Sequence, residues 1–288
     1  MDIFSGLESL GIKGIENLEL YSEEVTRVRK LEKEEEPEII KTPEELEEEH
    51  IFEKTFVCPV CDRKFSNKIM KSNKAKLLNT DMDLRPIHQN IDIVKYDVIS
   101  CPHCGYSVLT RFFSPLTMMQ VKKVKETIGK NYNRQEAIKR PLISYDEAIE
   151  RYKLALLSCV VKGTKDSEKA YVCLKTAWLY RGKAEHLPEE EKALKEKCEK
   201  EELLFLQNAY DGLVSARKKE MFPICGMDEL TLDYLLSALS YRLGKLETCA
   251  RLLSDILLKP TANNRIKDKA RILKEQLKKD IKEGRKEL

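Results

Sequence analysis

Apolar residues recur at helical spacing along most of the chain after residue 114. They follow the i, i+3, i+4 spacing that gives an amphipathic helix one apolar face. Helix-end signals divide the pattern, since Ser144 and Glu147 can form a capping box and Gly163 suits a helix end. The pattern predicts a helix that begins at Ser114-Pro115, a long charged helix that begins at Pro188, and further helices over about 144–163, 167–186, 228–243, 245–258 and 263–283.

The same spacing predicts which side chains these helices bury. We expect burial of Ala148, Ile149, Tyr152, Leu156 and Cys159 in one helix, of Tyr171, Leu174, Ala177 and Trp178 in the next, and of Leu203, Leu206, Tyr210 and Leu213 in the long one. Parts of this pattern resemble tetratricopeptide helix pairs. Tyr241-Arg242-Leu243-Gly244 with Ala250, Leu253 and Pro260 follows the turn and second helix of that motif, 144–149 resembles the start of a second helix, and 170–182 resembles a first helix. We therefore expect a tetratricopeptide-like helical domain over 114–288.

Short runs of alternating polar and apolar residues precede the helices and are typical of strands. Runs at 54–57, 64–66, 96–99 and 106–109 predict two hairpins, each built around a Cys-x-x-Cys turn. The insert between them, including Asn79 to His88, is interpreted as a loop with one short helix. The sequence therefore predicts a mainly α protein with a small β zinc-ribbon-like module at 51–113.

The N-terminal part differs from the rest of the chain in charge. Residues 1–50 hold 16 acidic and 6 basic residues, a net of −10, and the whole chain carries +3, so residues 51–288 carry +13. Residues 1–20 place apolar side chains among three glycines, which suits a short docking segment or an unstructured end, and 32–49 is a like-charged run typical of linkers. We expect 1–50 to be a flexible acidic arm, either a solvated tail or a competitor for the basic body.

Two Cys-x-x-Cys pairs are the strongest chemical signal in the chain. Cys58-Pro59-Val60-Cys61 and Cys101-Pro102-His103-Cys104-Gly105 provide four thiolates at the spacing of a tetrahedral metal site. Zinc is the expected metal, although iron uses the same ligand spacing, and a redox dithiol is the less common alternative. Because four thiolates leave no open coordination position, we expect a structural rather than a catalytic ion.

The other five cysteines are scattered singly, which fits a reducing compartment. Cys159, Cys173 and Cys249 fall at apolar helix positions, whereas Cys225 lies in a loop and is the one thiol to test for reactivity. No run approaches the roughly 20 apolar residues of a membrane span, and the chain start lacks the features of a signal peptide. We therefore expect a cytoplasmic protein.

Other polar residues are weaker site candidates. His88 and His103 could be spare metal ligands, but loop histidines more often have no metal role. Asp81 and Asp83 supply too few oxygens for a cation site, so turn capping is the default interpretation.

Basic residues gather in two places that could contact nucleic acid. They are Lys122, Lys123, Lys125, Lys130, Arg134, Lys139 and Arg140, and Arg265, Lys267, Lys269, Arg271, Lys274, Lys278 and Lys279. Tyr132, Phe112 and Phe113 near the first cluster could stack bases or could cover the joint between the two modules, which we favour. A solvated helix face is the commoner explanation for the second cluster.

The knuckles and their separation resemble an uncharacterised bacterial family, domain-of-unknown-function family 2225. The resemblance spans about 50–260 and rests on Cys58-Pro59-Val60-Cys61, on Asp81-x-Asp83-Leu84, and on Tyr96-x-Val98-x-x-Cys101-Pro102-x-Cys104-Gly105-Tyr106. It implies a cytoplasmic bacterial protein with a metal-binding knuckle and tetratricopeptide-like helices, and it implies no activity.

The chain has no glycine-rich phosphate loop, nucleophile elbow or His-Glu-x-x-His motif that would indicate an enzyme. We expect a non-enzymatic, zinc-stabilised helical-repeat adaptor that binds a protein or peptide partner, because stacked helix pairs form concave surfaces. The alternative is a zinc-ribbon nucleic-acid-binding regulator that uses the basic body and is gated by the acidic arm. A thiol-redox enzyme is the third and weakest possibility, because it requires cysteines that stay free of metal.

Overall fold

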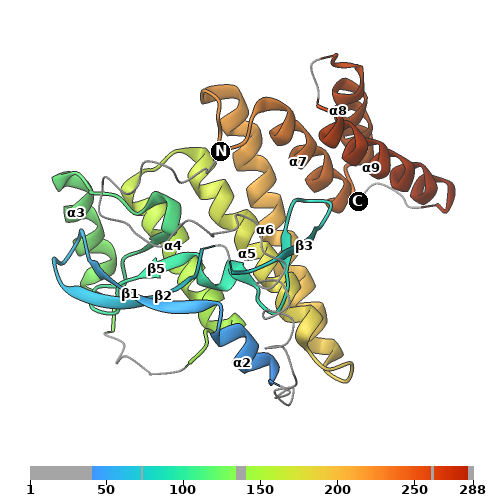
Figure 1. Cartoon of the computed structure of the whole chain (residues 1–288). Helices are drawn as coiled ribbons and strands as arrows, with labels where there is room; N and C mark the ends of the chain where they lie inside the picture. Colours follow the sequence, from blue (N-terminus) through green and yellow to red (C-terminus); the bar gives the residue numbers. More distant parts are fainter. Residues whose placement is uncertain (1–40, 73, 134–140, 261–262, 285–288) are drawn as a thin grey trace, which may run out of the picture. The chain divides into compact units, whose positions relative to one another are not determined.

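The computed structural model describes residues 41–72, 74–133, 141–260 and 263–284, where short strand pairs precede a succession of longer helices (Figure 1). The strands are β1 (Ile51–Val57), β2 (Lys64–Met70), β3 (Leu77–Thr80), β4 (Pro86–His88), β5 (Val98–Ser100) and β6 (Ser107–Leu109). The helices are α2 (Pro43–Glu48), η2 (Ile93–Tyr96), η3 (Thr110–Phe112), α3 (Met118–Val124), η4 (Lys125–Gly129), α4 (Tyr145–Lys162), α5 (Asp166–His186), α6 (Lys192–Lys219), α7 (Glu229–Arg242), α8 (Leu246–Leu258) and α9 (Asn264–Lys282).

The described residues confirm a mainly helical protein with small antiparallel strand pairs. β1 pairs with β2 and β5 pairs with β6, each pair around one Cys-x-x-Cys turn, as the sequence predicts. The insert differs from its prediction as a loop with one short helix, because β3 and β4 form a third hairpin and the short 3-10 helix η2 follows it. Backbone pairing of 77–80 with 86–88 satisfies polar groups that a loop would leave to water.

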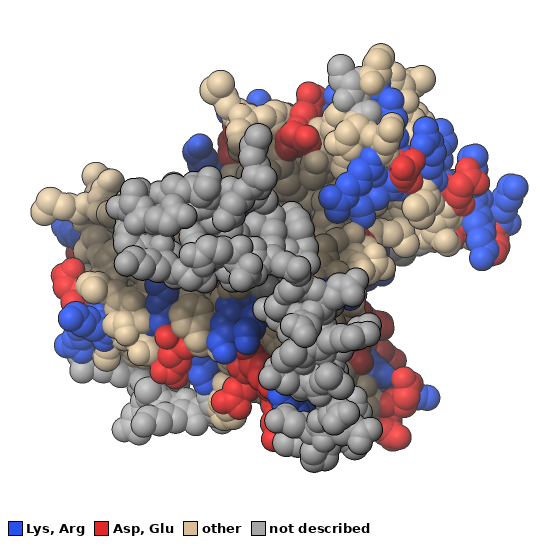
Figure 2. Space-filling model, in the orientation of Figure 1, with Lys and Arg blue, Asp and Glu red and all other residues tan. Residues whose placement is uncertain are grey.

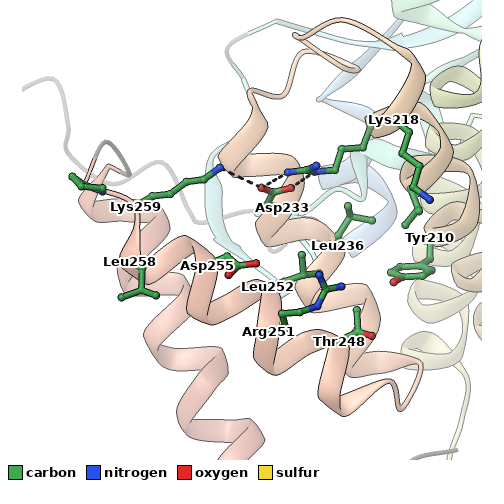
Figure 3. A pocket seen from close by; sticks show the side chains of 13 residues that line it. Tyr210, Lys218, Asp233, Leu236, Thr248, Arg251, Leu252, Asp255, Leu258 and Lys259 are labelled. Atoms are coloured by element: carbon green, nitrogen blue, oxygen red, sulfur yellow. Dashed lines mark hydrogen bonds and ion pairs between the residues drawn. The ribbon is translucent and has the colours of Figure 1, made fainter.

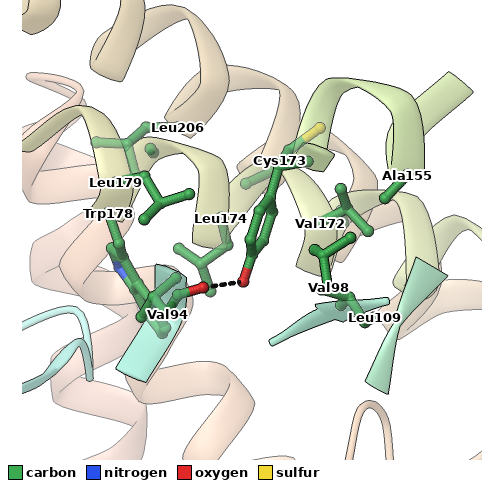
Figure 4. Packing of buried hydrophobic residues seen from close by; sticks show 14 of the residues in the cluster. Val94, Val98, Leu109, Ala155, Val172, Cys173, Leu174, Trp178, Leu179 and Leu206 are labelled. Atoms are coloured by element: carbon green, nitrogen blue, oxygen red, sulfur yellow. Dashed lines mark hydrogen bonds between the residues drawn. The ribbon is translucent and has the colours of Figure 1, made fainter. Parts of the chain in front are cut away.

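The second knuckle hairpin lies on the first long helix. The backbone N–H of Ser107 in β6 donates to the Ser158 hydroxyl of α4 at 3.3 Å. The Tyr152 hydroxyl of α4 donates to the Val94 carbonyl of η2 at 2.9 Å. Around these bonds, Val98 and other strand residues pack with side chains of α4 and α5 in one buried cluster (Figure 4). The strands and the helices therefore share a hydrophobic core.

The long helices follow the predicted boundaries closely where the sequence has clear end signals. Ser144 caps α4 by accepting the Glu147 N–H at 3.2 Å, and Gly163 ends it in the left-handed conformation. The Glu147 carboxylate accepts from Arg151 at 2.6 Å, so only the Ser144 half of the predicted capping box is formed. Successive helices from α4 to α9 contact one another in chain order. The tetratricopeptide-like character of this succession stays a prediction.

Three sequence predictions about helices were wrong. The helix expected at Ser114-Pro115 begins instead at α3, where Thr117 and Gln120 form a capping box. The long helix begins at Lys192 and not at Pro188, because the intervening residues form a turn in which the Glu191 N–H donates to the Pro188 carbonyl at 3.1 Å. Leu203 is 39% exposed and lies outside the buried face of α6.

The predicted acidic arm lies mostly in residues 1–40, outside the described residues. Its last part departs from the expected flexible linker, since Pro43–Glu48 forms the short helix α2. Glu47 in this helix accepts from the Tyr96 hydroxyl at 2.6 Å and pairs with Lys95 at 2.5 Å. Those contacts hold the end of the arm against η2.

A network of buried ion pairs joins the insert hairpin to three helices. The Asp83 carboxylate accepts from the Arg181 guanidinium of α5 at 2.6 and 3.0 Å and from the Trp178 indole at 3.0 Å. Arg181 also donates to Glu202 of α6 at 2.9 Å, and Glu202 accepts from Arg242 of α7 at 2.6 Å. The Arg181 guanidinium of α5 therefore connects the β3–β4 turn to α6, and Glu202 extends the network to α7.

Arg85 gives the same hairpin a second attachment. Its guanidinium donates to Asp81 at 2.6 Å and to both oxygens of Glu185 in α5 at 2.6 and 2.8 Å. Asp81 and Asp83 thus act as ion-pair partners rather than simple turn caps. Burial alone would raise the pKa of Asp83, but the Arg181 charge and the hydrogen bonds from Arg181 and Trp178 hold that pKa below its ordinary value.

Replacing Arg181 should destabilise the protein strongly. Arg181→Met leaves Asp83 and Glu202 buried without their shared partner, so we expect the free energy of unfolding to fall by about 3–5 kcal/mol in urea titrations at pH 7. Because the pKa of folded Asp83 is depressed, its stabilisation is present above the ordinary Asp pKa and is lost as the pH falls through the folded value. The difference between wild type and variant should therefore shrink in acid.

The matched control is Arg271→Met, because Arg271 and Asp268 form an ion pair in which both side chains are 61% exposed. It should change the free energy of unfolding by less than about 1 kcal/mol. An Arg181→Met effect no larger than that of the control would contradict the role given to the network.

Candidate functional site

The first Cys-x-x-Cys turn is closed by its own backbone. The Cys58 N–H donates to the Arg63 carbonyl at 3.0 Å, and the Asp62 N–H donates to the Cys58 carbonyl at 3.0 Å. Asp62 takes the left-handed conformation that this turn requires, with a φ of 58°. The Val60 N–H points at the Cys58 sulfur from 3.4 Å. The turn thus places a backbone donor beside a cysteine sulfur, an arrangement that would stabilise a thiolate.

The second turn repeats this arrangement. The Cys101 N–H donates to the Tyr106 carbonyl at 2.9 Å, and the Gly105 N–H donates to the Cys101 carbonyl at 3.0 Å. Gly105 has a φ of 71°, and a Cβ atom built on it would lie 2.5 Å from the Tyr132 ring. Both the conformation and the close approach of Tyr132 therefore require glycine at this position.

The four predicted cysteine ligands come together as the sequence indicates. The sulfur atoms of Cys58 and Cys104 lie 3.6 Å apart, those of Cys61 and Cys101 lie 3.7 Å apart, and all four lie within 4.8 Å of one another. In a tetrahedral site with metal–sulfur bonds of about 2.3 Å, the sulfur atoms are about 3.8 Å apart. This donor set and spacing fit a bound metal ion.

The protonation of the cluster also favours a cation. Hydrogen bonds from Cys104 and Cys58 lower the pKa of the Cys101 thiol, and the same bonds raise the pKa of Cys104 and of Cys58. One thiolate therefore forms readily, while its charge and the burial of the cluster oppose the ionisation of the others. A metal ion removes that opposition, because its positive charge stabilises all four thiolates.

An asparagine joins the two knuckle hairpins independently of the sulfur atoms. Asn67 of β2 is 4% exposed, and its side-chain amide donates to the Val98 carbonyl at 3.2 Å. Its carbonyl oxygen accepts from the Ser100 N–H and from Arg151 of α4, both at 3.4 Å. Asn67 thereby ties β2 to β5 and to the helical core.

An apolar shell covers the cysteine cluster. Buried side chains from both hairpins, α3 and η4 surround it, including Phe65, Ile99, Val124 and Ile128. Phe113 packs edge-on against Phe56 with ring centroids 5.3 Å apart. These side chains limit the access of water to the sulfur atoms, which suits a structural site more than one that exchanges ligands.

Most other predicted site residues lie apart from the cysteines. Among the described residues, the four cysteines are the one group of three or more His, Cys, Asp or Glu placed to hold a metal ion. His103 lies near the Lys64 carbonyl, at 3.4 Å from its Nε2 atom, and His88 lies in β4. Burial raises the pKa of Cys225, the one thiol singled out for a reactivity test, to about 11, which disfavours its thiolate.

An open groove of about 680 Å³ lies between α6, α7 and α8 and is a second candidate site (Figure 3). Its wall in α8 includes Leu252 and Leu258, whereas the buried face of α8 is made by other residues, namely Leu246, Cys249, Leu253 and Ile256. The sequence analysis missed this groove. The available signal was Leu258, a leucine placed off the apolar face of an otherwise regular amphipathic helix.

A protein-family model described as "Uncharacterized protein conserved in bacteria (DUF2225)" matches residues 51–277. The chain belongs to this family. The match contains both knuckles and runs into α9, so the DUF2225 unit includes the cysteine cluster, the insert hairpin and the groove. No curated protein and no solved structure was found to match the chain. None of the described helices has the length and apolar composition needed to cross a bilayer.

Removing one cysteine should release the metal ion and loosen one hairpin. Cys101→Ser removes a ligand, and we expect loss of stoichiometric metal by elemental analysis and faster hydrogen exchange in β1 and β2. The helices beyond residue 144 should keep their protection, because their core is built largely from their own side chains. Cys225→Ser, outside the cluster, is the control and should keep its metal. A Cys101→Ser protein that retains both metal and strand protection would contradict the assignment.

Proposed function

We propose that this protein is a non-enzymatic adaptor in which a structural zinc ion stabilises the strand module and the helices bind a peptide segment of a partner protein. The groove between α6, α7 and α8 is the observation that carries the proposal. It is open, it has a volume suited to several side chains of a ligand, and it is lined by residues of both apolar and charged character.

Zinc is the metal we assign to the four cysteines. A tetrathiolate with sulfur separations of 3.6 and 3.7 Å supports a tetrahedral ion held by Cys58, Cys61, Cys101 and Cys104. Iron accepts the same ligands, and elemental analysis of the purified protein distinguishes the two metals. With four protein ligands, the ion would contribute folding energy and no open position for a substrate.

Leucines that line the groove, one of them exposed, support peptide binding there. Leu258 is 80% exposed at the end of α8, and Leu252 lies one helical turn and a half before it on the groove side. Leu236 of α7 lies buried beneath the groove. A leucine side chain that stays exposed to water contributes no hydrophobic free energy to folding. Full coverage of that side chain by a ligand would contribute roughly 1.5–3 kcal/mol to binding. Helix-in-groove ligands use such contacts as anchors.

Placing a charge at Leu258 should abolish partner binding without affecting the fold. We expect proteins captured by the wild type from nuclease-treated native lysate to be lost with Leu258→Glu, because a carboxylate would have to be buried against the ligand. Leu258 is too exposed to support the core, so the thermal midpoint should change little.

Ile272→Glu is the matched control, since Ile272 is 66% exposed on α9 and does not line the groove. It should capture the same proteins as the wild type. Equal capture by both variants would argue against the groove as the binding site. Material that disappears on nuclease treatment would instead favour a nucleic-acid ligand.

The second candidate function, a nucleic-acid-binding regulator, has support from α9. Four cations of this helix have no ion-pair or hydrogen-bond partner among the described residues: Arg265, Lys267, Lys274 and Lys282. Acidic residues are interspersed with basic ones on the face of α9 that Figure 2 displays, which weakens the attraction for a polyanion.

A salt titration tests this second candidate. If α9 contacts about four phosphates, the affinity for a single-stranded oligonucleotide of about 20 bases should fall with salt at a log–log slope of about −3. Anisotropy measurements from about 50 to 200 mM salt give this slope. Binding that is absent at low salt would remove the candidate. Deletion of residues 1–50 should tighten the binding if the acidic arm competes for the basic surface.

A further inference from the structure

We infer that the groove between α6, α7 and α8 selects an acidic peptide with apolar anchor residues, a conclusion that rests on the proposed peptide-binding function. Two features of the groove together indicate this ligand class. Two cations on opposite walls lack ion-pair partners within the described part of the chain, and an apolar surface extends between the walls toward an exposed leucine.

The buried carboxylate that lines the groove already has hydrogen-bond and ion-pair partners within the protein. Asp233 of α7 accepts from Arg217 of α6 at 2.5 and 3.0 Å and lies 3.8 Å from Lys259. Both cations also lie 3.2 Å from Glu229. These two cations are therefore neutralised within the protein rather than available to attract a ligand, and Figure 3 shows Lys259 directed toward Asp233.

Two further cations have no such neutralisation. Lys218 projects from α6 and Arg251 from α8, both are exposed, and both line the groove. Neither has an ion-pair partner among the described residues. Arg251 presents a planar fork of donors that suits a carboxylate. A ligand carboxylate between the walls would therefore meet positive charge from two helices.

The surface between these cations is apolar and not fully covered. Leu252 and Val214 are half-buried there, and Leu258 is exposed beside them. At the far end, Tyr210 is held in place by the Lys245 ammonium, which lies 4.2 Å from its ring centroid. Such a surface gains from contact with leucine or aromatic side chains, which a purely charged ligand does not provide.

A carboxylate on the rim limits the choice of ligand further. Asp255 lies in α8 one turn beyond Arg251 and lines the same groove. It would repel a continuous row of phosphates, whereas a peptide can place single carboxylates near Arg251 and Lys218 and apolar residues elsewhere. The arrangement therefore favours an acidic peptide over a nucleic acid.

Selection from a random peptide library tests the inference with the whole protein. A phage-displayed library of peptides of about 12 residues is selected on the metal-loaded wild type and counted by sequencing. The enriched peptides, called winners below, are expected to combine Asp or Glu with Leu, Ile or Phe. Their affinity, measured with a labelled winning peptide, should fall about tenfold with Lys218→Glu/Arg251→Glu. The same change outside the groove, Arg265→Glu/Lys282→Glu, should leave the affinity unchanged.

The outcomes distinguish the claim of peptide binding from the claim of selectivity for acidic peptides. Winners without acidic residues, or winners insensitive to Lys218→Glu/Arg251→Glu, would overturn the selectivity while keeping the peptide-binding function. A library that yields no enriched peptide would overturn both. A single-stranded oligonucleotide that binds through Lys218 and Arg251 and displaces the winning peptide would also overturn the inference.

Discussion

Four thiolates within 4.8 Å of one another repel so strongly that only a bound cation can keep them all ionised. This constraint shapes the N-terminal half of the described structure. The two knuckles belong to different hairpins, so a metal ion bound by the four sulfur atoms would also hold β1–β2 beside β5–β6. Asn67 and the apolar shell assist, but they add hydrogen bonds and packing to an arrangement that the cysteines require. We therefore regard a bound metal ion as the main cross-link between the two hairpins of this module.

The cysteine cluster brings together both ends of the insert between the knuckles, and the ion-pair network fixes its middle. Asp83 and Arg85 attach the β3–β4 hairpin to α5, while Thr80 accepts from Lys269 of α9 at 2.8 Å. Leu84 between them packs against both hydrophobic clusters of the helices. The insert consequently connects the cysteine module to helices that lie far away in sequence. That linkage gives the strand module a physical role in positioning α7 and α9, whose neighbour α8 forms one wall of the groove.

The buried carboxylates lie in groups where each one has hydrogen-bond donors around it. The Arg181 network and the Asp233 group each place carboxylates in the core with two or more donors around them, which compensates for the loss of water. Lys218 and Arg251 are different, because they face the open groove without a described partner. The contrast between neutralised and free cations is what distinguishes the interior of this helical region from the surface that we propose for ligand binding.

The sequence alone determined the features that depend on local chemistry. The Cys-x-x-Cys spacing predicted the cluster of Cys58, Cys61, Cys101 and Cys104, and helix caps such as Ser144 and Gly163 predicted the ends of α4, because each signal acts over a few residues. The β3–β4 hairpin, the Asp83–Arg181 pair and the groove were decided only by the tertiary structure. Asp83 and Arg181 are 98 residues apart in the chain, and pairs of this kind leave no local pattern. Partners across a core are chosen by packing and burial, and those exist only once the chain has folded.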